Sequence, residues 1–550
     1  MAGELCVLCY RIARLMKAIR QQLESAWYLF EKSRSYLVGK NLDEVQIEVY
    51  DLAFSLAELQ AAKVMLEYAG IDCGAQEKSF KESVAFLHVA ETIANLHTRL
   101  RLRPSAYGLV ASDFEPDHLE LLDQIQSSES LQSLGQRFRR EGGGFPPDHL
   151  DEEKGLMRRT FRKFADEEVA PLAEQIHRED QTIPDSIIKG VRELGCFGLS
   201  VPQRYGGLNP DERDDSLGMV VVTEELSRAS LGAAGSLITR PEIMSRAILE
   251  GGSDSQKIKW LPKIAKGEPL VAISVTEPGT GSDVASVSLK ATKVKGGWLL
   301  NGGKTWCTFA GKAGAILVLA RTEPEVKPLH RGLSLFVVEK PSNDGHEFLY
   351  KSPGGGVVSG KAISTLGYRG MHSFEMFYED FFVPDTNLVG EENGRGNGFY
   401  YTMRGFSGGR LQTSARAAGV MQAAFEAALR YAEDRHVFGR SVASYPLTLQ
   451  KIAKMGTSIT VVRQAGYHVA GLMDEGDGQL EASLLKLYAC RMAEWVTREA
   501  LQIHGGMGYA EESPVSRYFV DARVLSIFEG AEETLALRVV GKALLDGTYL

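Results

Sequence analysis

A β-rich stretch set between two helical regions constrains the fold more than any other feature of this sequence. Residues 271 to about 385 contain short runs such as GAILVLAR, LSLFVVEK and FEMFYEDFFV, separated by Gly, Pro, Asn and Asp. Runs of β-branched and aromatic residues between turn formers predict strands. On both sides of this stretch, apolar residues recur every three or four positions, the spacing of amphipathic helices. The chain is therefore predicted to be mainly α-helical with a central β domain, a sheet or a barrel.

The helical parts divide further. The stretch RREGGGFPPDH at 139–149 contains three Gly and two Pro, which exclude a regular element and predict a domain boundary. Pro171 predicts a break or kink in the helical pattern that follows. The helical rhythm of residues 50–100 resembles that of residues 453–501, so the first segment is either a degenerate copy of the last or an unrelated helical pair. We expect an N-terminal helical extension over 1–145, a helical domain over 150–270, a β domain over 271–388 and a C-terminal helical bundle over 398–550.

Composition excludes several classes of function. The chain has 550 residues, a formal net charge of -9 and interspersed acidic and basic residues, which argue against an extended nucleic-acid-binding face. No apolar run reaches the roughly 18 residues that a membrane-spanning helix requires, so no integral membrane segment is predicted. We expect a cytoplasmic protein. The mitochondrial matrix is the alternative, because Arg11, Arg14, Lys17 and Arg20 form a basic helical face that resembles a transit peptide.

The cysteines do not predict a disulfide framework or a metal site. Six cysteines are spread over the chain, which is typical of a protein from a reducing compartment. Cys6 and Cys9 have the spacing of a metal or redox pair, but no second pair or nearby His completes a site. We therefore predict no bound metal.

Two glycine-containing clusters have the residue types of a nucleotide-binding site. In VTEPGTGSD, residues 275–283, Gly279 and Gly281 predict a turn with exposed backbone N–H groups, and Thr276 and Ser282 add hydroxyls. This combination would bind a phosphate or a polar ring edge, or it would simply be a capped β-turn. Gly505-Gly506, after a helical pattern, would let a ligand approach the backbone or would only end the helix.

A third cluster, AEDRHVFGR at 432–440, combines a cation with an aromatic residue. Arg435 is suited to phosphate, and Phe438 is suited to stacking on a ring or to packing in a core. None of the three clusters is specific by itself.

Taken in order, these clusters resemble the acyl-CoA dehydrogenase family of flavoproteins. The resemblance includes LGCFGLSVPQRYGG at 194–207, KWLPKIAKGE at 259–268, VTEPGTGSD at 275–283 and LGYRGMHSFEMFYEDFFVP at 366–384. The resemblance covers residues 150 to 550. It implies a helical domain, a β-barrel or sandwich domain and a C-terminal four-helix bundle. It also implies α,β-desaturation of an acyl-CoA with FAD as cofactor, electron transfer to an electron-transfer flavoprotein, and a homodimer or homotetramer.

The resemblance also implies roles for individual residues. Ile273, Val275, Thr276 and Ser282 match the segment along the flavin, Trp306 and Thr308 match the pair that covers the isoalloxazine, and Arg435, Phe438, Gln502, Gly505 and Gly506 match the residues that bind the adenine and pyrophosphate half of FAD, largely from a neighbouring subunit. Ser282, Arg410 and Gly530 match positions near the substrate.

Glu529, in SIFEGAEETLAL, matches the family's catalytic base, which removes the α proton while the β hydrogen leaves as hydride. Ile527 and Phe528 beside it would exclude water and favour a more basic carboxylate. By itself the motif would favour an acid in the first turn of a helix over a base. Some members carry the base on an earlier helix, just before an Arg, but Gly409 occupies that position here.

The sequence departs from the family pattern at two places. Pro446 follows Tyr445 where the family commonly has Gln, which puts one adenosine-side contact in doubt. After Gly530 the family usually has Thr, followed two residues later by a polar amide. Here Ala531, Glu532 and Glu533 follow instead.

Two other functions remain open from the sequence. An acyl-CoA oxidase would return electrons from the flavin to oxygen, but such enzymes usually carry their extra helical domain at the C-terminus. A non-catalytic acyl-CoA-binding or scaffold protein would not need Glu529. The acyl group is undetermined, and Arg240 would either bind an acidic acyl tail or face solvent.

Overall fold

A computed structural model describes residues 2–114 and 119–549, apart from the side chains of residues 2–13, 119 and 407. The chain divides into two compact units. One contains Met1–Leu150, Met421–Val469 and Gly478–Leu550, and the other contains Asp151–Val420 and Ala470–Asp477. The first boundary follows the Gly- and Pro-rich stretch at 139–149, in which no helix or strand forms after Arg140.

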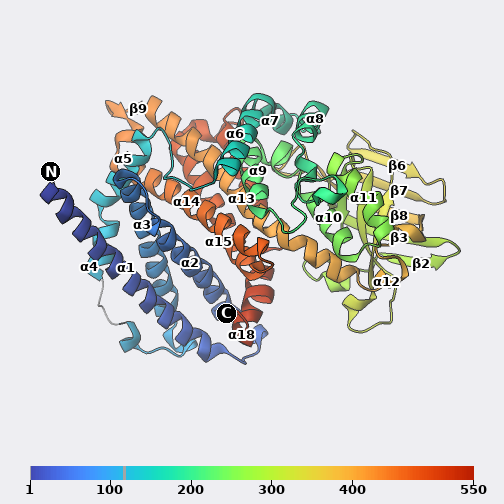
Figure 1. The fold of residues 1–550 in the computed structure, drawn as a ribbon, viewed down its shortest axis with the longest axis horizontal. Coiled ribbons are helices and arrows are strands. Elements are labelled where there is room, and N and C mark those ends of the chain that lie inside the picture. The colour runs from blue at the N-terminus through green and yellow to red at the C-terminus, as the bar shows by residue number, and fades with distance from the viewer. Residues whose placement is uncertain (1, 115–118, 550) are drawn as a thin grey trace. The chain divides into compact units, whose positions relative to one another are not determined.

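The unit that begins at Asp151 contains the β domain, an eight-stranded sheet (Figure 1). The strand order is β1-β4-β2-β3-β8-β7-β6, and β5 pairs with β4. β1 and β4 are parallel, whereas β3 and β8 form a long antiparallel pair. The strands are β1 (Val271–Ser274), β2 (Lys290–Val294), β3 (Gly297–Thr308), β4 (Ala315–Arg321), β5 (Leu333–Glu339), β6 (Glu347–Lys351), β7 (Val357–Ala362) and β8 (Ser373–Pro384).

Strand β4 shows why its sequence, AILVLAR, has few polar residues. Ile316 and Val318 lie in a core on one face of the sheet, and Leu317 and Leu319 lie in a second core on the other face. Successive side chains of a strand point to opposite faces, so a strand covered on both sides is apolar throughout. Two helices, α10 (Thr239–Gly251) and α11 (Asp254–Lys266), contribute to the second core.

Four more helices precede α10 in this unit: α6 (Glu152–Phe164), α7 (Ala170–Arg178), α8 (Asp185–Glu193) and α9 (Ser216–Ala229). The irregularity predicted near Pro171 is a π-helical turn, Ala165–Val169, which joins α6 to α7 without ending the helix. Pro171 lies just after this turn, and a π-helical turn is one way in which a helix accommodates the missing N–H of a proline.

The other unit is helical. The extension forms α1 (Ala2–Leu37), α2 (Gln46–Gly70), α3 (Ala75–Leu102), α4 (Leu119–Gln126) and α5 (Ser128–Arg140). The C-terminal region of this unit contains the end of α13 (Gly398–Asp434) and most of α14 (Pro446–Asp474). It also contains α15 (Gln479–His504), α16 (Pro514–Leu525), α17 (Glu532–Thr534) and α18 (Lys542–Asp546). None of the described helices is both long and apolar enough to cross a membrane.

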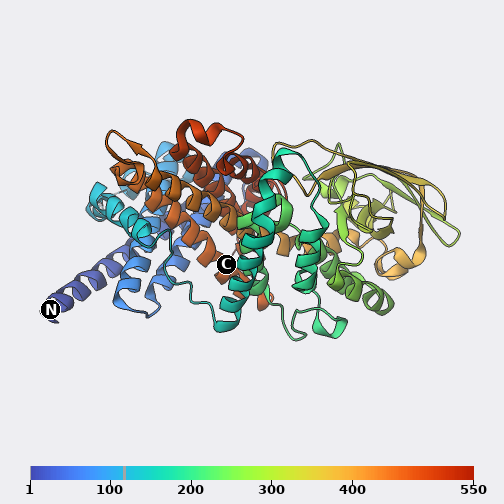
Figure 2. The same ribbon diagram turned by 90° about the horizontal axis from the view of Figure 1, so that it is seen from above.

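The extension packs directly against the C-terminal helices of its unit, and both views show the blue helices beside the orange and red ones (Figures 1 and 2). Lys454 on α14 forms an ion pair of 2.7 Å with Glu91 on α3. A Cβ atom added at Gly135 of α5 would lie 2.1 Å from the carbonyl oxygen of Leu449 on α14. Contacts this close mean that the two segments share one core.

Candidate active site

The predicted flavin segment, residues 275–283, follows β1 and forms a tight turn. Glu277 and Thr280 exchange backbone hydrogen bonds of 3.0 Å each. Thr305 of β3 donates its N–H to the carbonyl of Thr276 at 2.9 Å and so joins the turn to the sheet. A Cβ atom on Gly279 would meet no atom within 4 Å, so the turn leaves open space for a ligand.

A buried ion pair supports this turn from below. Lys304 of β3 is 1% exposed, and its Nζ donates to Glu277 Oε1 at 2.9 Å and to the Val275 carbonyl at 2.7 Å. Glu277 also accepts hydrogen bonds from the N–H groups of Ser288 and Leu289 and from the Ser288 hydroxyl. Burial raises the pKa of Glu277, but Lys304 and these donors outweigh burial, and the pKa lies below its usual value.

Trp306 is presented outward by an irregularity in the sheet. The pairing of β3 with β8 shifts register between Lys304 and Cys307, which leaves Trp306 in a β-bulge with φ of 56°. A bulge re-aims the side chain of the bulged residue. Trp306 is therefore 55% exposed in a strand whose neighbours Thr305 and Cys307 are buried.

The other residues of the predicted flavin site lie on the same part of the sheet. Thr308 ends β3, and its hydroxyl lies 2.8 Å from that of Ser373. Ser282 is exposed after the turn, and Ile273 is half-buried on β1. Val275 is 7% exposed and packs in the core, so only its backbone is available to a ligand. The structure thus brings this predicted set together.

The predicted adenine-binding residues lie in the helical unit, where one ring contact joins their two segments. Tyr431 of α13 stacks on His504, the last residue of α15, with ring centroids 4.4 Å apart. Arg435 donates its N–H to the Tyr431 carbonyl and so lies one turn further along. Gly505 and Gly506 follow His504, and a Cβ atom at either would meet nothing within 4 Å.

Three of these residues are open to solvent. Phe438 is 98% exposed, and Arg435 and Gln502 are also exposed. A phenylalanine so exposed on a two-stranded ribbon, β9 (His436–Val437) with β10 (Arg440–Ser441), has no packing role within its own unit. At the departure noted in the sequence, Tyr445 packs under the guanidinium of Arg440, 3.9 Å from ring centroid to Cζ.

Glu529 lies in the loop between α16 and α17, with φ of 54°, and is not the first-turn acid of a helix. The first turn of α17 carries Glu532 and Glu533 instead. Glu529 forms no ion pair with any residue that the structure describes, and its Oε2 is buried without a hydrogen-bond partner. A buried carboxylate oxygen that lacks a partner costs free energy, and such groups occur where chemistry needs them.

Two groups that the sequence did not single out support this loop. Lys486 of α15 donates its Nζ to the carbonyls of Phe528 and Gly530, on either side of Glu529. Glu532 accepts a hydrogen bond of 2.9 Å from Arg491 of α15 and another from the hydroxyl of Tyr50 on α2. Glu532, which lies between the two departures from the family pattern at Ala531 and Glu533, is therefore paired with a residue of the extension.

The alternative base position lies beside the start of α10. A Cβ atom on Gly408 would lie 2.1 Å from Glu242 Oε1, so α13 and α10 are in close contact here, next to Gly409 and Arg410. Gln412 accepts a hydrogen bond of 2.7 Å from Thr239. Gly409 has no titratable side chain, so it cannot serve as the base.

Arg240, also at the start of α10, is a buried cation. It is 6% exposed, and its Nη1 donates to the Ser236 carbonyl at 3.1 Å. No carboxylate among the described residues forms an ion pair with it. The alternative that Arg240 faces solvent is wrong.

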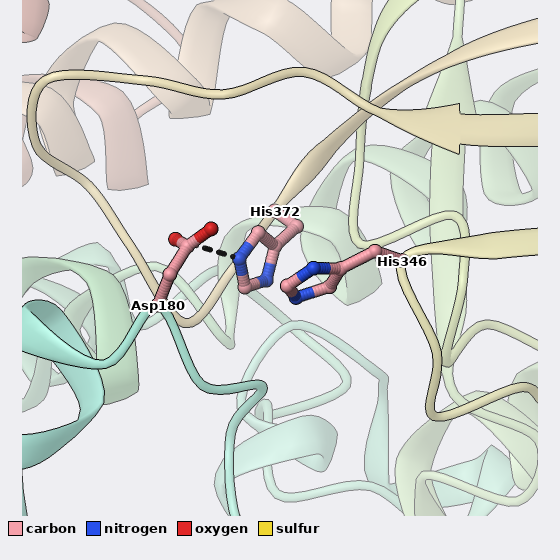
Figure 3. A group of neighbouring side chains, drawn as sticks. All are labelled: Asp180, His346 and His372. Atoms are coloured by element: carbon pink, nitrogen blue, oxygen red, sulfur yellow. Dashed lines mark hydrogen bonds and ion pairs between the residues drawn. The ribbon is translucent and has the colours of Figure 1, made fainter.

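Asp180, His346 and His372 form a cluster of metal-ligand types that the sequence did not indicate (Figure 3). Their candidate ligand atoms all lie within 4.8 Å of one another, and His372 Nε2 lies 3.1 Å from Asp180 Oδ1. Arg369 Nε lies 3.6 Å from the same Asp180 oxygen, which disfavours a second cation there. We interpret the contact of Asp180 with His372 as a hydrogen bond that ties the loop after α7 to the start of β8, because burial lowers the pKa of His372 and favours its neutral form. Cys6 and Cys9 lie outside the described side chains.

Comparison with known proteins gives a consistent result. Family models described as acyl-CoA dehydrogenase N-terminal, middle and C-terminal domains match residues 151–268, 272–381 and 396–545. A (2S)-methylsuccinyl-CoA dehydrogenase of Cereibacter sphaeroides is 44% identical over 404 residues, 73% of this chain and 71% of that protein. An acyl-CoA dehydrogenase of Bacillus subtilis (strain 168) is 35% identical over 73% of this chain and 100% of its own. The structure of butyryl-CoA dehydrogenase from Megasphaera elsdenii, at 29% identity, has a TM-score of 0.65 and covers 72% of this chain and 99% of that one.

Proposed function

This chain belongs to the acyl-CoA dehydrogenase family of oxidoreductases, and from that premise we propose that it desaturates an acyl-CoA thioester with Glu529 as the α-proton base. The observation that carries the proposal is the state of Glu529. It lies in a loop outside any helix, with its backbone in the left-handed region. It has no ion-pair partner among the described residues, and one of its carboxylate oxygens is buried without a hydrogen-bond partner. A base held without partners is free to accept a proton.

FAD is the cofactor, and the residues present fit it. The exposed face of Trp306 offers a surface for a flat ring, and the open turn at Gly279 leaves room for it beside the strand. Arg435 offers a cation for the pyrophosphate, and the backbone at Gly505 and Gly506 is open to close approach. When bound, FAD supplies the hydride acceptor of the reaction. Since the second group of residues is exposed, it would serve the cofactor of a second copy, so we expect at least a homodimer.

Residues of the loop that carries Glu529 have separate roles in the proposed reaction. Glu529 takes the α proton through its carboxylate. Its backbone N–H, which donates to no backbone carbonyl among the described residues, is available to the thioester carbonyl, where negative charge develops as the proton leaves. Ile527 is 55% exposed and supplies apolar surface that substrate would cover, removing water from the carboxylate.

Arg240 suggests that the acyl group carries a second carboxylate. A buried guanidinium without a carboxylate partner is costly, and an anionic ligand would offset that cost. Arg240 starts the helix that packs against α13 beside Arg410. The relative from Cereibacter sphaeroides is named for (2S)-methylsuccinyl-CoA, whose acyl group ends in a carboxylate. We therefore place short acyl-CoA esters of dicarboxylic acids first among substrates, with an electron-transfer flavoprotein as acceptor and the cytoplasm as location.

The test of the reaction is direct. Purified protein should be yellow, and anaerobic addition of substrate should bleach the flavin. Glu529→Gln should keep FAD and bind acyl-CoA but should lose turnover by about a thousandfold, because it removes the proposed base. An active Gln variant would disprove the assignment of the base, and a colourless protein that takes up no FAD would disprove the enzyme itself.

The test of the substrate class compares two acyl groups of equal length. For a dicarboxylic mono-CoA ester, Arg240→Met should lower kcat/KM about 10- to 100-fold, since a hydrogen bond to a charged group contributes about 1.5–3 kcal/mol. For the neutral acyl-CoA the same variant should change kcat/KM less than threefold. Equal losses on both substrates would show that Arg240 is only structural.

A further inference from the structure

Lys486 is a buried side chain that forms hydrogen bonds to the loop that carries Glu529. It lies on α15 and is 1% exposed. Its Nζ donates to the Phe528 carbonyl at 2.8 Å and to the Gly530 carbonyl at 2.5 Å. The two acceptors belong to the residues on either side of Glu529, so one ammonium group fixes the backbone both before and after it.

Because the peptide bond is planar, the hydrogen bond to the Phe528 carbonyl also fixes the direction of the Glu529 N–H. In a trans peptide the C=O of one residue and the N–H of the next point in opposite directions. With the Phe528 carbonyl directed at Lys486, the N–H of Glu529 must point away from α15. Glu529 has φ of 54°, a conformation that a residue with a side chain adopts only when its surroundings hold it there.

We propose that Lys486 is a positioning residue for the reaction: by bonding both carbonyls it holds the Glu529 carboxylate and the Glu529 N–H in their working orientations. This inference rests on the proposed role of Glu529. It adds that the donor to the thioester carbonyl and the base are set by one lysine 43 positions earlier in the chain.

The charge of Lys486 has a second effect. A cation bonded to the Phe528 carbonyl polarises that peptide unit, and its N–H, the one contributed by Glu529, becomes a stronger donor. Burying an ammonium is expensive, and a neutral side chain would fill the same space more cheaply. The free-energy cost of burying the Lys486 ammonium is explained by its effect on the Glu529 N–H, a donor that the proposed reaction uses.

The experiment separates proton removal from turnover. The probe is an acyl-CoA with α hydrogens but no β hydrogen, incubated with holoenzyme in deuterated water, and exchange of the α proton is followed by NMR. Lys486→Met should slow exchange and kcat about 10- to 100-fold while KM and FAD content change less than threefold, because misplacement of about 1 Å can cost that much. Lys486→Arg, which keeps the charge, should recover part of the loss.

A matched control removes a different tether of the same helix. Cys490, one turn further along α15, donates its thiol to the Leu525 carbonyl at 3.2 Å, at the end of α16 and before the loop that carries Glu529. Cys490→Ala should leave exchange and kcat within twofold of the wild type. A similar loss in the Cys490 variant would overturn the specific role of Lys486.

The outcomes also separate this inference from the proposed function. If Glu529→Gln abolishes exchange while folded Lys486→Met exchanges at the wild-type rate with wild-type kcat, the inference about Lys486 is overturned and the base stands. If Glu529→Gln still exchanges, the assigned base is wrong. Should the Met variant not fold, Lys486→Gln replaces it, and wild-type exchange in that variant overturns the inference equally.

Discussion

The buried pair of Glu277 and Lys304 offers the sharpest test of how the flavin turn is built. We predict that Glu277→Gln destabilises the unit containing the sheet by about 3–5 kcal/mol, the usual cost of leaving one partner of a buried ion pair uncompensated. Glu277 accepts four hydrogen bonds, from Lys304, from two backbone N–H groups and from a hydroxyl. An amide turns its NH₂ toward some of these donors and leaves them unsatisfied at about 1–3 kcal/mol each.

This loss would be large against a total stability of about 5–15 kcal/mol for a typical domain. It would also be local, because Lys304 bonds the Val275 carbonyl and Glu277 belongs to the turn. We therefore expect FAD occupancy to fall along with stability. Replacing both partners, Glu277→Gln with Lys304→Met, should cost less than the sum of the two single changes by at least about 1 kcal/mol.

The assay is hydrogen exchange followed by mass spectrometry, read on peptides from β3 and β8, which report the opening free energy of the sheet. The matched control is Glu347→Gln, which breaks the exposed pair of Glu347 with Lys361 on the neighbouring strands β6 and β7. Exposed pairs contribute about 0–1 kcal/mol, so this variant should be near neutral. If Glu277→Gln costs no more than Glu347→Gln, the buried pair does not support the turn.

The pH dependence of this pair has a definite sign. The pKa of Glu277 is lowered in the folded protein, so the unfolded chain takes up a proton at a higher pH than the folded chain. Its contribution to stability is complete above the usual carboxyl pKa and is lost as pH falls through the lowered value. The Gln variant lacks this acid-dependent component, and its stability should fall less steeply between pH 5 and pH 3.

Three further predictions concern the helical unit. Burial lowers the pKa of His88 to about 4, so the unfolded chain binds a proton near pH 6.5 while the folded chain does not. The free energy of unfolding should therefore fall by about 1.4 kcal/mol between pH 7.5 and pH 5.5. His88→Gln, measured by urea unfolding at both pH values, should lack this loss, and an equal loss would contradict the assignment. Gly456→Ala would bring a Cβ atom to 2.5 Å from the ring of Phe138 and should destabilise the protein by about 1–3 kcal/mol. In Gly471→Ala, on the same helix, the new Cβ atom would meet no atom within 4 Å, and this variant should not be destabilised. Thermal melting compares the two variants, and equal effects would show that the close contact is unimportant. Arg435→Ala should weaken FAD binding about 10- to 100-fold, and unchanged flavin occupancy after gel filtration would refute its role.

The layout of the fold follows from local patterns. The change from a three- or four-residue period to β-rich runs near residue 271 places β1 at Val271–Ser274, and the helix irregularity near Pro171 and the turn at Glu277–Thr280 were predictable from single residues. These features depend on neighbours in sequence, which explains why composition and spacing suffice for them.

The supports of the site were not predictable in the same way. Lys486 lies in the apolar run SLLKLYAC, and a lysine between two buried leucines is a signal that could have been noticed, but its acceptors lie more than 40 residues away. The contact of Asp180 with His372 joins residues 192 positions apart. Trp306 gives no sign in the sequence that a bulge in its pairing with β8 turns it outward. Such contacts depend on which segments the fold brings together.

The hydrogen bond from Tyr50 to Glu532 joins the N-terminal extension to the segment that follows Glu529. Glu532 follows Ala531, where the sequence leaves the family pattern, and it is held by Arg491 on one side and by a residue from the extension on the other. A chimaera that took its first 150 residues from another protein would leave this acid with one partner fewer, three positions from Glu529. The residue at position 532 is therefore a marker: relatives that carry an acid there should also carry a tyrosine-bearing extension, and the two should be gained or lost together.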